Sequence, residues 1–255
     1  MGLAGHARPR SLHMAELGPV AEKSDKNAEH CSFCEELFGP DEISSPLVKT
    51  FFAEAALSSR TLFETEKLFV VPSLGPLTVG HILVLPKSHY YSVGEIPPAD
   101  LPELEYVVRE SHKILTLTFG SCLAFEHGCV EDVGKPGACI DHAHLHMLPL
   151  KGDLRPAIEK RFGCGERIQS LRELRQFAGR RVPYLYYQDQ DGEGHAYEAL
   201  EAPSQFFRQV VAVLMHGAEN WDWKSNLRIP AVVQTLLLLR EPFCQLAKTR
   251  YAARS

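Results

Sequence analysis

Three histidines alternate with apolar residues near the middle of the chain, in the segment Asp141-His142-Ala143-His144-Leu145-His146-Met147-Leu148. Residues two apart in a β-strand lie on the same face, about 6.6 Å apart along the chain. The alternation therefore predicts a strand with three imidazoles on one face and Ala143, Leu145 and Met147 on the core face. Because every buried imidazole needs a polar partner, three on one face are poor core residues. The pattern indicates nucleophilic chemistry or metal binding; chance histidines on a surface strand are the plainest alternative.

A second chemical signal is the pair Cys31 and Cys34, whose spacing is that of a metal-binding knuckle. The chain has seven cysteines, and no apolar run near its start has the pattern of a signal peptide. We therefore expect a reduced, cytoplasmic setting, in which close cysteines bind metal rather than form disulfides. No run of about 18 apolar residues predicts a membrane span.

Strands and one helix flank the histidines. Apolar runs predict strands over 68–71 and 77–85, separated by turn residues, then 122–126 and 140–150. Apolar spacing predicts a helix over 101–118, with Asp100 as the N-cap of a capping box and Gly120 as its end. A shorter helix is expected over 46–58, and a glycine-rich loop over 127–139 leads into the histidine strand.

The chain changes character after residue 150. Basic residues accumulate between 155 and 181, either to cover a phosphate chain or as a solvated helix face. Two aromatic runs, 184–187 and 195–200, flank a Gly/Asp turn and predict a hairpin. Helices are expected from Pro203 through Met215, with Ser204 as N-cap, and over 230–249.

Three motifs in the same order resemble those of the histidine-triad (HIT) superfamily. His142–Leu148 matches its His-φ-His-φ-His-φ-φ motif, in which φ is apolar; Gly80–His89 resembles its Gly-His strand and Pro-Lys-x-His signature; and Cys31-x-x-Cys34 lies where many members begin. The resemblance implies an α+β fold, with an antiparallel sheet of about five strands and a packed helix over residues 30–150. We expect a flexible tail over 1–29 and a mixed α/β extension over 151–255 packed on the HIT domain.

The resemblance also implies roles for two members of the triad. His144 corresponds to the nucleophile, whose Nε2 attacks the α-phosphorus of a nucleotide conjugate and forms a nucleotidyl-histidine. Its Nδ1–H then needs a main-chain carbonyl as acceptor to hold the tautomer. His146 would contact phosphate oxygens or the leaving group.

Further residues are candidates for binding phosphate. The glycine-rich loop can bring main-chain N–H groups close to an anion, and Phe125-Glu126-His127 resembles the Phe-Glu-Asn of galactose-1-phosphate uridylyltransferases. Residues 204–208 put polar groups at a helix start, where anions are favoured. The candidates are His127, Gly137, Ala138, Cys139, Gln205 and Arg208. Trp221 and Trp223 either stack on a base or pack in the core.

In zinc-containing members of the superfamily, the two cysteines are joined by two histidines. By motif position these are His89 and His142, which together with Cys31 and Cys34 give a Cys2His2 set for one structural zinc ion. A reduced, metal-free pair is the alternative. His81 reads as a hydrogen-bonded core histidine rather than a ligand.

The resemblance implies an enzyme acting at the α-phosphorus of a nucleotide conjugate. If water is the second acceptor, the enzyme is a hydrolase or phosphoramidase; if phosphate is, it is a phosphorylase; and if a sugar phosphate is, it is a nucleotidyltransferase. His146 favours a hydrolase or a phosphorylase, because the uridylyltransferases have Gln at that position. A non-catalytic nucleotide-binding regulatory protein and a nucleic-acid repair factor similar to aprataxin are alternatives. The net charge of −5 disfavours duplex nucleic acid as a partner. A homodimer is expected because many members of the superfamily are homodimers.

Overall fold

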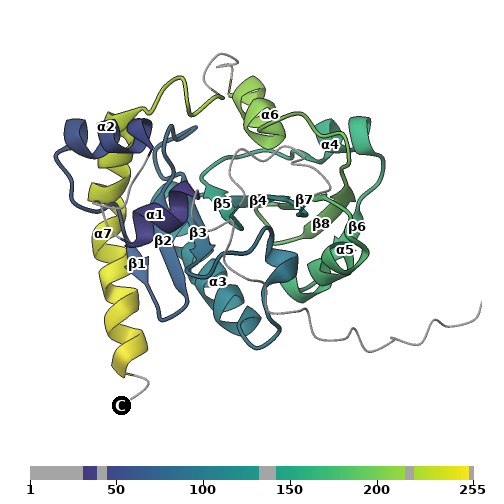
Figure 1. The fold of residues 1–255 in the computed structure, drawn as a ribbon, viewed down its shortest axis with the longest axis horizontal. Coiled ribbons are helices and arrows are strands. Elements are labelled where there is room, and N and C mark those ends of the chain that lie inside the picture. The colour runs from purple at the N-terminus through teal and green to yellow at the C-terminus, as the bar shows by residue number, and fades with distance from the viewer. Residues whose placement is uncertain (1–30, 39–44, 132–141, 216–220, 253–255) are drawn as a thin grey trace, which may run out of the picture.

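The computed structural model describes residues 31–38, 45–131, 142–215 and 221–252. Within this part of the chain, one antiparallel sheet of eight strands has the order β1-β2-β3-β5-β4-β7-β8-β6 (Figure 1). The strands are β1 (Phe63–Glu64), β2 (Leu68–Pro72), β3 (Ile82–Pro86), β4 (Leu123–Gly128), β5 (Leu145–Leu148), β6 (Glu166–Ile168), β7 (Tyr184–Gln188) and β8 (Gly194–Glu198). The predicted α+β class is confirmed.

The strand count is larger than expected because the extension continues the sheet. Strands β2 to β5 correspond to the four ranges expected, and β1 is a short strand that the sequence did not indicate. Strand β7 pairs with the free edge of β4, with Phe125 opposite Tyr187. Strands β7 and β8 form the predicted hairpin. Its tyrosines are buried strand formers, so pairing with β4 satisfies main-chain groups and buries aromatic surface together.

Helices cover both faces of the sheet (Figure 1). One face carries α3 (Leu101–Phe119), the short 3-10 helices η2 (Val93–Glu95) and η3 (Leu171–Leu174), α5 (Arg175–Arg180) and part of α7 (Ile229–Ala252). The other carries α1 (Ser32–Phe38) over β2 and β3, and α4 (Arg155–Phe162) and α6 (Phe206–Leu214) over β4 and β7. Helix α2 (Pro46–Ala55) packs near the start of α7.

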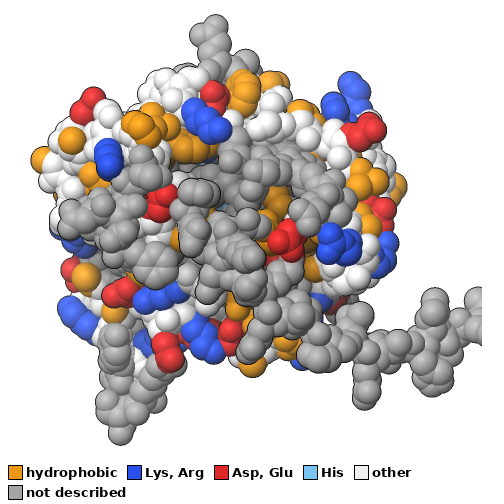
Figure 2. Space-filling model, viewed as in Figure 1, with side chains coloured by type: hydrophobic (Ala, Val, Ile, Leu, Met, Phe, Trp, Pro, Cys, Tyr) orange, Lys and Arg blue, Asp and Glu red, His pale blue; other side chains and the backbone are white. Residues whose placement is uncertain are grey.

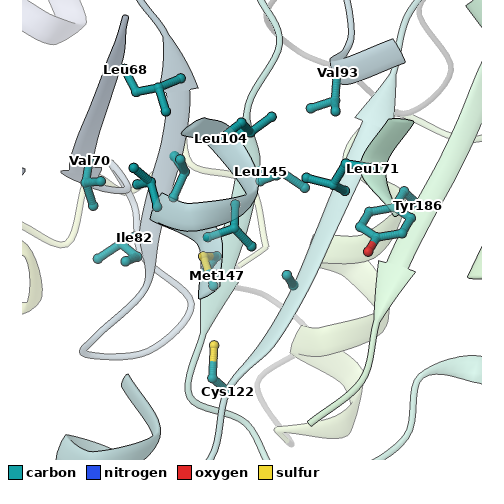
Figure 3. Packing of buried hydrophobic residues seen from close by; sticks show 14 of the residues in the cluster. Leu68, Val70, Ile82, Val93, Leu104, Cys122, Leu145, Met147, Leu171 and Tyr186 are labelled. Carbon is teal, nitrogen blue, oxygen red and sulfur yellow. The ribbon is translucent and has the colours of Figure 1, made fainter. Parts of the chain in front are cut away.

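The apolar half of the histidine alternation lies in the main core. Leu145 and Met147 are fully buried among Ile82, Leu104 and other residues beneath α3 (Figure 3). Burying each such side chain stabilises the fold by roughly 1.5–3 kcal/mol. The alternation therefore orients the segment as predicted, with its imidazoles on the face that carries α1 and α6.

Two predicted strands are shorter in the structure. β5 covers only Leu145–Leu148, while His142 to His144 precede it and residues 140 and 141 lie outside the described part. β3 begins at Ile82 because the chain turns at Gly80, whose φ is +89° and whose Cβ position would lie 2.6 Å from the ring of Phe119. The positive φ and the close ring both require glycine there.

Helix predictions succeed better than cap predictions. α3 ends at Phe119 with Gly120 in the left-handed region, as expected, but the Asp100 side chain makes no cap hydrogen bond and pairs with Lys67 instead. An ammonium group nearby competes with the helix N–H groups for that carboxylate. α6 likewise begins after Gln205 (φ 57°), not after Ser204.

On the face drawn in Figure 2, the described basic and acidic side chains are interspersed. Within the basic run at residues 155–181, Arg167 pairs with Glu193 and Arg180 pairs with Glu198, as expected of a solvated face. Among the described residues, no helix is long and apolar enough to cross a membrane.

Candidate active site and metal centre

His144 lies where the chain enters β5. The segment is anchored by the main-chain bond from the Ala143 N–H to the Tyr90 carbonyl, at 2.6 Å. The His144 Nδ1–H donates to the His142 carbonyl at 2.6 Å, which is the kind of acceptor that the resemblance implied. This bond leaves the lone pair on Nε2. Burial is the largest cause that lowers the pKa of His144, to about 4, so the ring is neutral at pH 7 and can act as a nucleophile.

His146 is held in one tautomer by a chain of two hydrogen bonds. The Leu77 N–H donates to His81 Nδ1 at 3.1 Å, so the neutral His81 ring carries its hydrogen on Nε2. That Nε2–H donates to His146 Nδ1 at 2.9 Å, and His146 therefore carries its own hydrogen on Nε2. Burial lowers the pKa of both rings well below the usual value. His146 is thus a neutral hydrogen-bond donor, and His81 is its buried partner, as expected of a core histidine.

Aromatic rings fix the position of these imidazoles. His146 stacks on Phe125 with ring centroids 4.5 Å apart, and Phe125 stacks on Phe207 of α6 at 4.7 Å. Phe33 of α1 meets His144 edge-on at 5.3 Å. The imidazoles are thus packed between α1 on one side and the extension on the other.

A pocket lies beside His144 and His146. Phe33 belongs to its wall, and the extension supplies Trp223 and Arg208. The pocket is therefore built from residues nearly two hundred positions apart in the sequence.

Two buried arginines line this pocket, and one of them is paired with a carboxylate. Arg208 is 2% exposed, and its guanidinium donates to the carbonyls of Trp221 (2.7 Å) and Gly75 (2.5 Å). Its charge also helps to lower the pKa of His144 and His146, after burial. Arg60, also 2% exposed, forms a two-pronged ion pair with Glu36 at 2.6 and 2.7 Å. A fixed guanidinium beside neutral imidazoles favours an anionic ligand such as phosphate.

The other predicted phosphate ligands have different surroundings. His127 accepts a hydrogen bond from the Phe207 N–H at its Nε2 (3.2 Å), and burial lowers its pKa to about 3. Gln205 donates to Asp222 at 3.0 Å and does not line the pocket. The structure thus gives both side chains a partner in the protein where the sequence suggested phosphate. Gly137, Ala138 and Cys139 lie outside the described residues.

The four predicted metal ligands come together behind the pocket. One ligand atom each from Cys31, Cys34, His89 and His142 lies within 4.8 Å of all the others. Sulfur–nitrogen separations are 3.6 Å for Cys31 to His142, 3.5 Å for Cys34 to His142 and 3.4 Å for Cys34 to His89. Tetrahedral zinc would place such atoms roughly 3.6 Å apart, so this donor set fits zinc.

The surroundings of the cluster also suit a cation. The His142 Nε2–H donates to the Pro86 carbonyl at 2.8 Å, which leaves Nδ1 with its lone pair toward the cysteines. The hydrogen bond with Cys34 is the largest cause that lowers the pKa of Cys31, to about 2, with further help from His142 and His89. Thiolate and neutral imidazole are the forms that bind zinc.

Sequence reasoning missed most of the pocket wall, including Phe33, Glu36 and Arg60. Phe33 stands between the two cysteines, yet nothing in its type indicates that its ring meets the triad. Arg60 follows two serines in what reads as a polar loop, and its burial becomes apparent only when α1 and β2 are assembled. The motifs mark the triad itself but not the elements packed upon it.

An antiparallel sheet with a His-φ-His-φ-His segment entering a central strand beside a pocket is the arrangement that the resemblance to histidine-triad proteins implied. The family described as "HIT domain" matches residues 54–153, which contain β1 to β5, α3 and all three histidines. Over these residues the chain is similar to the HIT family.

Curated relatives resemble this part of the chain. The asymmetrical bis(5'-nucleosyl)-tetraphosphatase of Schizosaccharomyces pombe is 26% identical over 101 residues, which are 40% of this chain and 54% of that protein. The adenosine 5'-monophosphoramidase of Candida albicans is 27% identical over 99 residues, 38% of this chain and 65% of that protein. The chain thus spans between half and two thirds of the length of these relatives. Among solved structures, a hypothetical histidine triad nucleotide-binding protein of Sulfolobus tokodaii is 27% identical, with a TM-score of 0.32 over 41% of this chain and 70% of that one.

Proposed function

We propose that this protein is an enzyme that attacks the α-phosphorus of a nucleotide conjugate with His144 and passes the nucleotidyl group to water. The observation that carries the proposal is the His144 tautomer: Nδ1–H is bound to a main-chain carbonyl, and the neutral Nε2 lies at a pocket with a buried arginine. Two curated relatives are named as a dinucleoside tetraphosphatase and an adenosine phosphoramidase, and these names support nucleotide conjugates as the substrate class.

The proposed first step forms a bond from His144 Nε2 to phosphorus. The bond from phosphorus to the leaving group breaks, and the leaving group keeps the electron pair. His146 donates a hydrogen bond from Nε2–H to a phosphoryl or leaving-group oxygen. It acts as a donor and not as an acid, because its pKa lies well below the usual range and its Nδ1 is occupied by His81. Such fixed donors stabilise charge that develops in the transition state.

In the proposed second step, a water oxygen bonds to phosphorus and loses a proton to solvent, while the bond from phosphorus to His144 Nε2 breaks and its electron pair returns to the ring. The nucleoside monophosphate leaves and His144 is restored. Arg208 faces the phosphate groups, and Trp223 offers a ring for the base. The sequence candidates His127, Gly137, Ala138, Cys139 and Gln205 remain proposals as phosphate or nucleotide contacts. With phosphate in place of water the same site would be a phosphorylase, and without turnover it would be a nucleotide-binding regulator.

Zinc at Cys31, Cys34, His89 and His142 is part of the proposal. With its four protein ligands it would be structural, tying the start of α1 to the segment that carries His144. A cytoplasmic setting and a homodimer also remain proposals. Because β4 is paired with β7, a dimer formed through this sheet would have to use β1 or β6.

The test is turnover of dinucleoside polyphosphates, nucleoside phosphoramidates and nucleotide sugars, each with and without phosphate. We expect a substrate in the first two groups, and acid quenching should trap a protein whose mass has increased by one nucleotidyl group. His144→Ala should abolish both signals, whereas His195→Ala on β8, a histidine outside the pocket wall, should retain them. Turnover or an adduct that survives in His144→Ala would overturn the assignment, and tight nucleotide binding without turnover would favour the regulatory protein.

A further inference from the structure

Four residues of the extension form hydrogen bonds with the loop between β2 and β3. The Gly75 N–H donates to the Leu227 carbonyl at 2.9 Å, and Arg208 donates to the Gly75 carbonyl. Arg228 Nη1 donates to two successive carbonyls, Pro76 at 2.7 Å and Leu77 at 2.8 Å. At the end of the loop, the Gly80 N–H donates to Thr235 Oγ1 at 2.9 Å. Consecutive main-chain groups of this loop are therefore fixed by residues 208–235.

The loop and the extension pack closely at Gly75. Gly75 has a φ of +55°, and a Cβ there would lie 2.7 Å from the Asn226 carbonyl oxygen and from Trp223 Cα. Arg228 is itself in the left-handed region, with a φ of 49°, and its own N–H is held by Asn226 Oδ1 at 3.0 Å. A side chain at position 75 would therefore clash with the extension, and the Asn226 side chain helps to hold the Arg228 main chain in place.

The peptide that Arg228 holds is also the one that acts on the histidines. The Pro76 carbonyl and the Leu77 N–H belong to one planar peptide unit and point in opposite directions. Arg228 binds its oxygen end, and His81 Nδ1 accepts from its N–H end. A cationic donor on the oxygen polarises the unit and strengthens the N–H as a donor.

We propose that Arg228 is a positioning residue for the candidate active site: it fixes the Pro76–Leu77 peptide, which sets the tautomer of His81 and through it the Nε2–H of His146. Without this peptide, His81 can carry its hydrogen on either nitrogen, and His146 loses its defined donor. The extension thus contributes to the proposed chemistry through a residue that does not line the pocket. The kinetic consequence rests on the proposed function, but the tautomers do not.

The test uses ¹⁵N-histidine-labelled full-length protein and two-bond ¹H–¹⁵N spectra, which distinguish protonated from unprotonated ring nitrogens. Signals are assigned with His81→Gln and His146→Gln. We expect single tautomers in the unaltered protein and mixed tautomers at both rings in Arg228→Met, with Arg228→Lys restoring them in part. On the best substrate, kcat should fall roughly ten- to a hundredfold while KM changes little, because displaced catalytic groups cost rate rather than binding.

The matched control is Arg175→Met. Arg175 also donates to a main-chain carbonyl, that of Ile96 at 3.0 Å, but its helix, α5, lies beyond the candidate site. It should leave the histidine signals and kcat unchanged. If Arg228→Met keeps the single tautomers, or if both variants lose the same activity, the proposal fails. If the tautomers mix only in Arg228→Met while no protein turns over substrate, the positioning role stands and the proposed function fails. Arg228→Lys supplies the comparison if Arg228→Met does not fold.

Discussion

His142 and His144 lie two residues apart and present opposite ring nitrogens to their surroundings. His142 donates Nε2–H to the Pro86 carbonyl and turns Nδ1 toward Cys31 and Cys34. His144 donates Nδ1–H to the His142 carbonyl, which leaves Nε2 for the pocket. The difference is made by which ring nitrogen a main-chain carbonyl holds, so one short motif offers both a candidate metal ligand and a candidate nucleophile.

The two surroundings also differ in what lies opposite. Two thiols face His142, and burial together with cationic Arg208 keeps His144 and His146 neutral. A metal cluster needs donors from separate segments to converge, and it stabilises the fold when it closes. A nucleophile needs one free lone pair beside open space. The alternating sequence supplies both because all its imidazoles share one face.

The largest expected effect separates the two histidines. His144→Ala should lower kcat by at least about a thousandfold, because a nucleophile has no substitute, and should leave one zinc per chain. His142→Ala should lose the zinc and lower the melting temperature by roughly 6–12 °C, as expected if bound metal contributes about 3 kcal/mol. Zinc analysis and thermal unfolding measure the contrast.

Chelation of the unaltered protein should reproduce the unfolding shift of His142→Ala, and added zinc should reverse it. Cys164→Ser is the matched control, since Cys164 is an exposed thiol outside the cluster. Loss of zinc in His144→Ala, or a melting temperature unchanged by chelation, would contradict the assignment of separate roles to His142 and His144.

Acid should affect the pocket through His144. Its pKa is lowered to about 4, so kcat/KM should stay level from pH 7 to 5 and fall tenfold per pH unit below about 4. The sign for stability follows from the same shift. A histidine that ionises near 6.5 when unfolded and near 4 when folded stabilises the protein fully above pH 6.5, and this contribution is lost as the pH falls toward 4.

The measurement is kcat/KM and the unfolding free energy from pH 7.5 to 3.5. His127, with a pKa lowered to about 3, should contribute to stability with the same sign. An acid limb of kcat/KM centred near 6.5 would contradict a buried, neutral His144.

The motifs in residues 68–148 carry most of what could be predicted. Alternation predicts which side of β5 is buried, and spacing predicts α3 and the hairpin of β7 and β8. Two kinds of interaction could not be predicted from the sequence. One is competition between local partners, such as the pairing of the Asp100 carboxylate with Lys67 instead of the helix N–H groups; the other is long-range strand pairing, such as that of β7 with β4. Neither event leaves a periodic signal in the sequence.

The candidate site divides in the same way. The four cluster residues could be predicted because their types and spacing are chemical, and the structure brings them together. Arg60 and Arg228 could not, because their partners are main-chain carbonyls and an acidic side chain on distant segments. A carbonyl is present at every residue, so the sequence does not show which one an arginine will reach.

The smallest effect expected concerns the residue that touches both environments. The Phe33 ring lies 5.7 Å from that of His142 and 5.3 Å from that of His144, both edge-on. Since Phe33 stands between the two cysteines, metal binding would fix its ring against His144. Phe33→Leu should lower kcat only about two- to tenfold, the value of one aromatic pair, and leave zinc content unchanged. Phe69→Leu, in the same apolar cluster but outside the pocket wall, is the control. If Phe33→Leu matches Phe69→Leu in kcat, the two histidine environments work independently; if it also releases zinc, Phe33 belongs to the metal centre rather than to the boundary between the two.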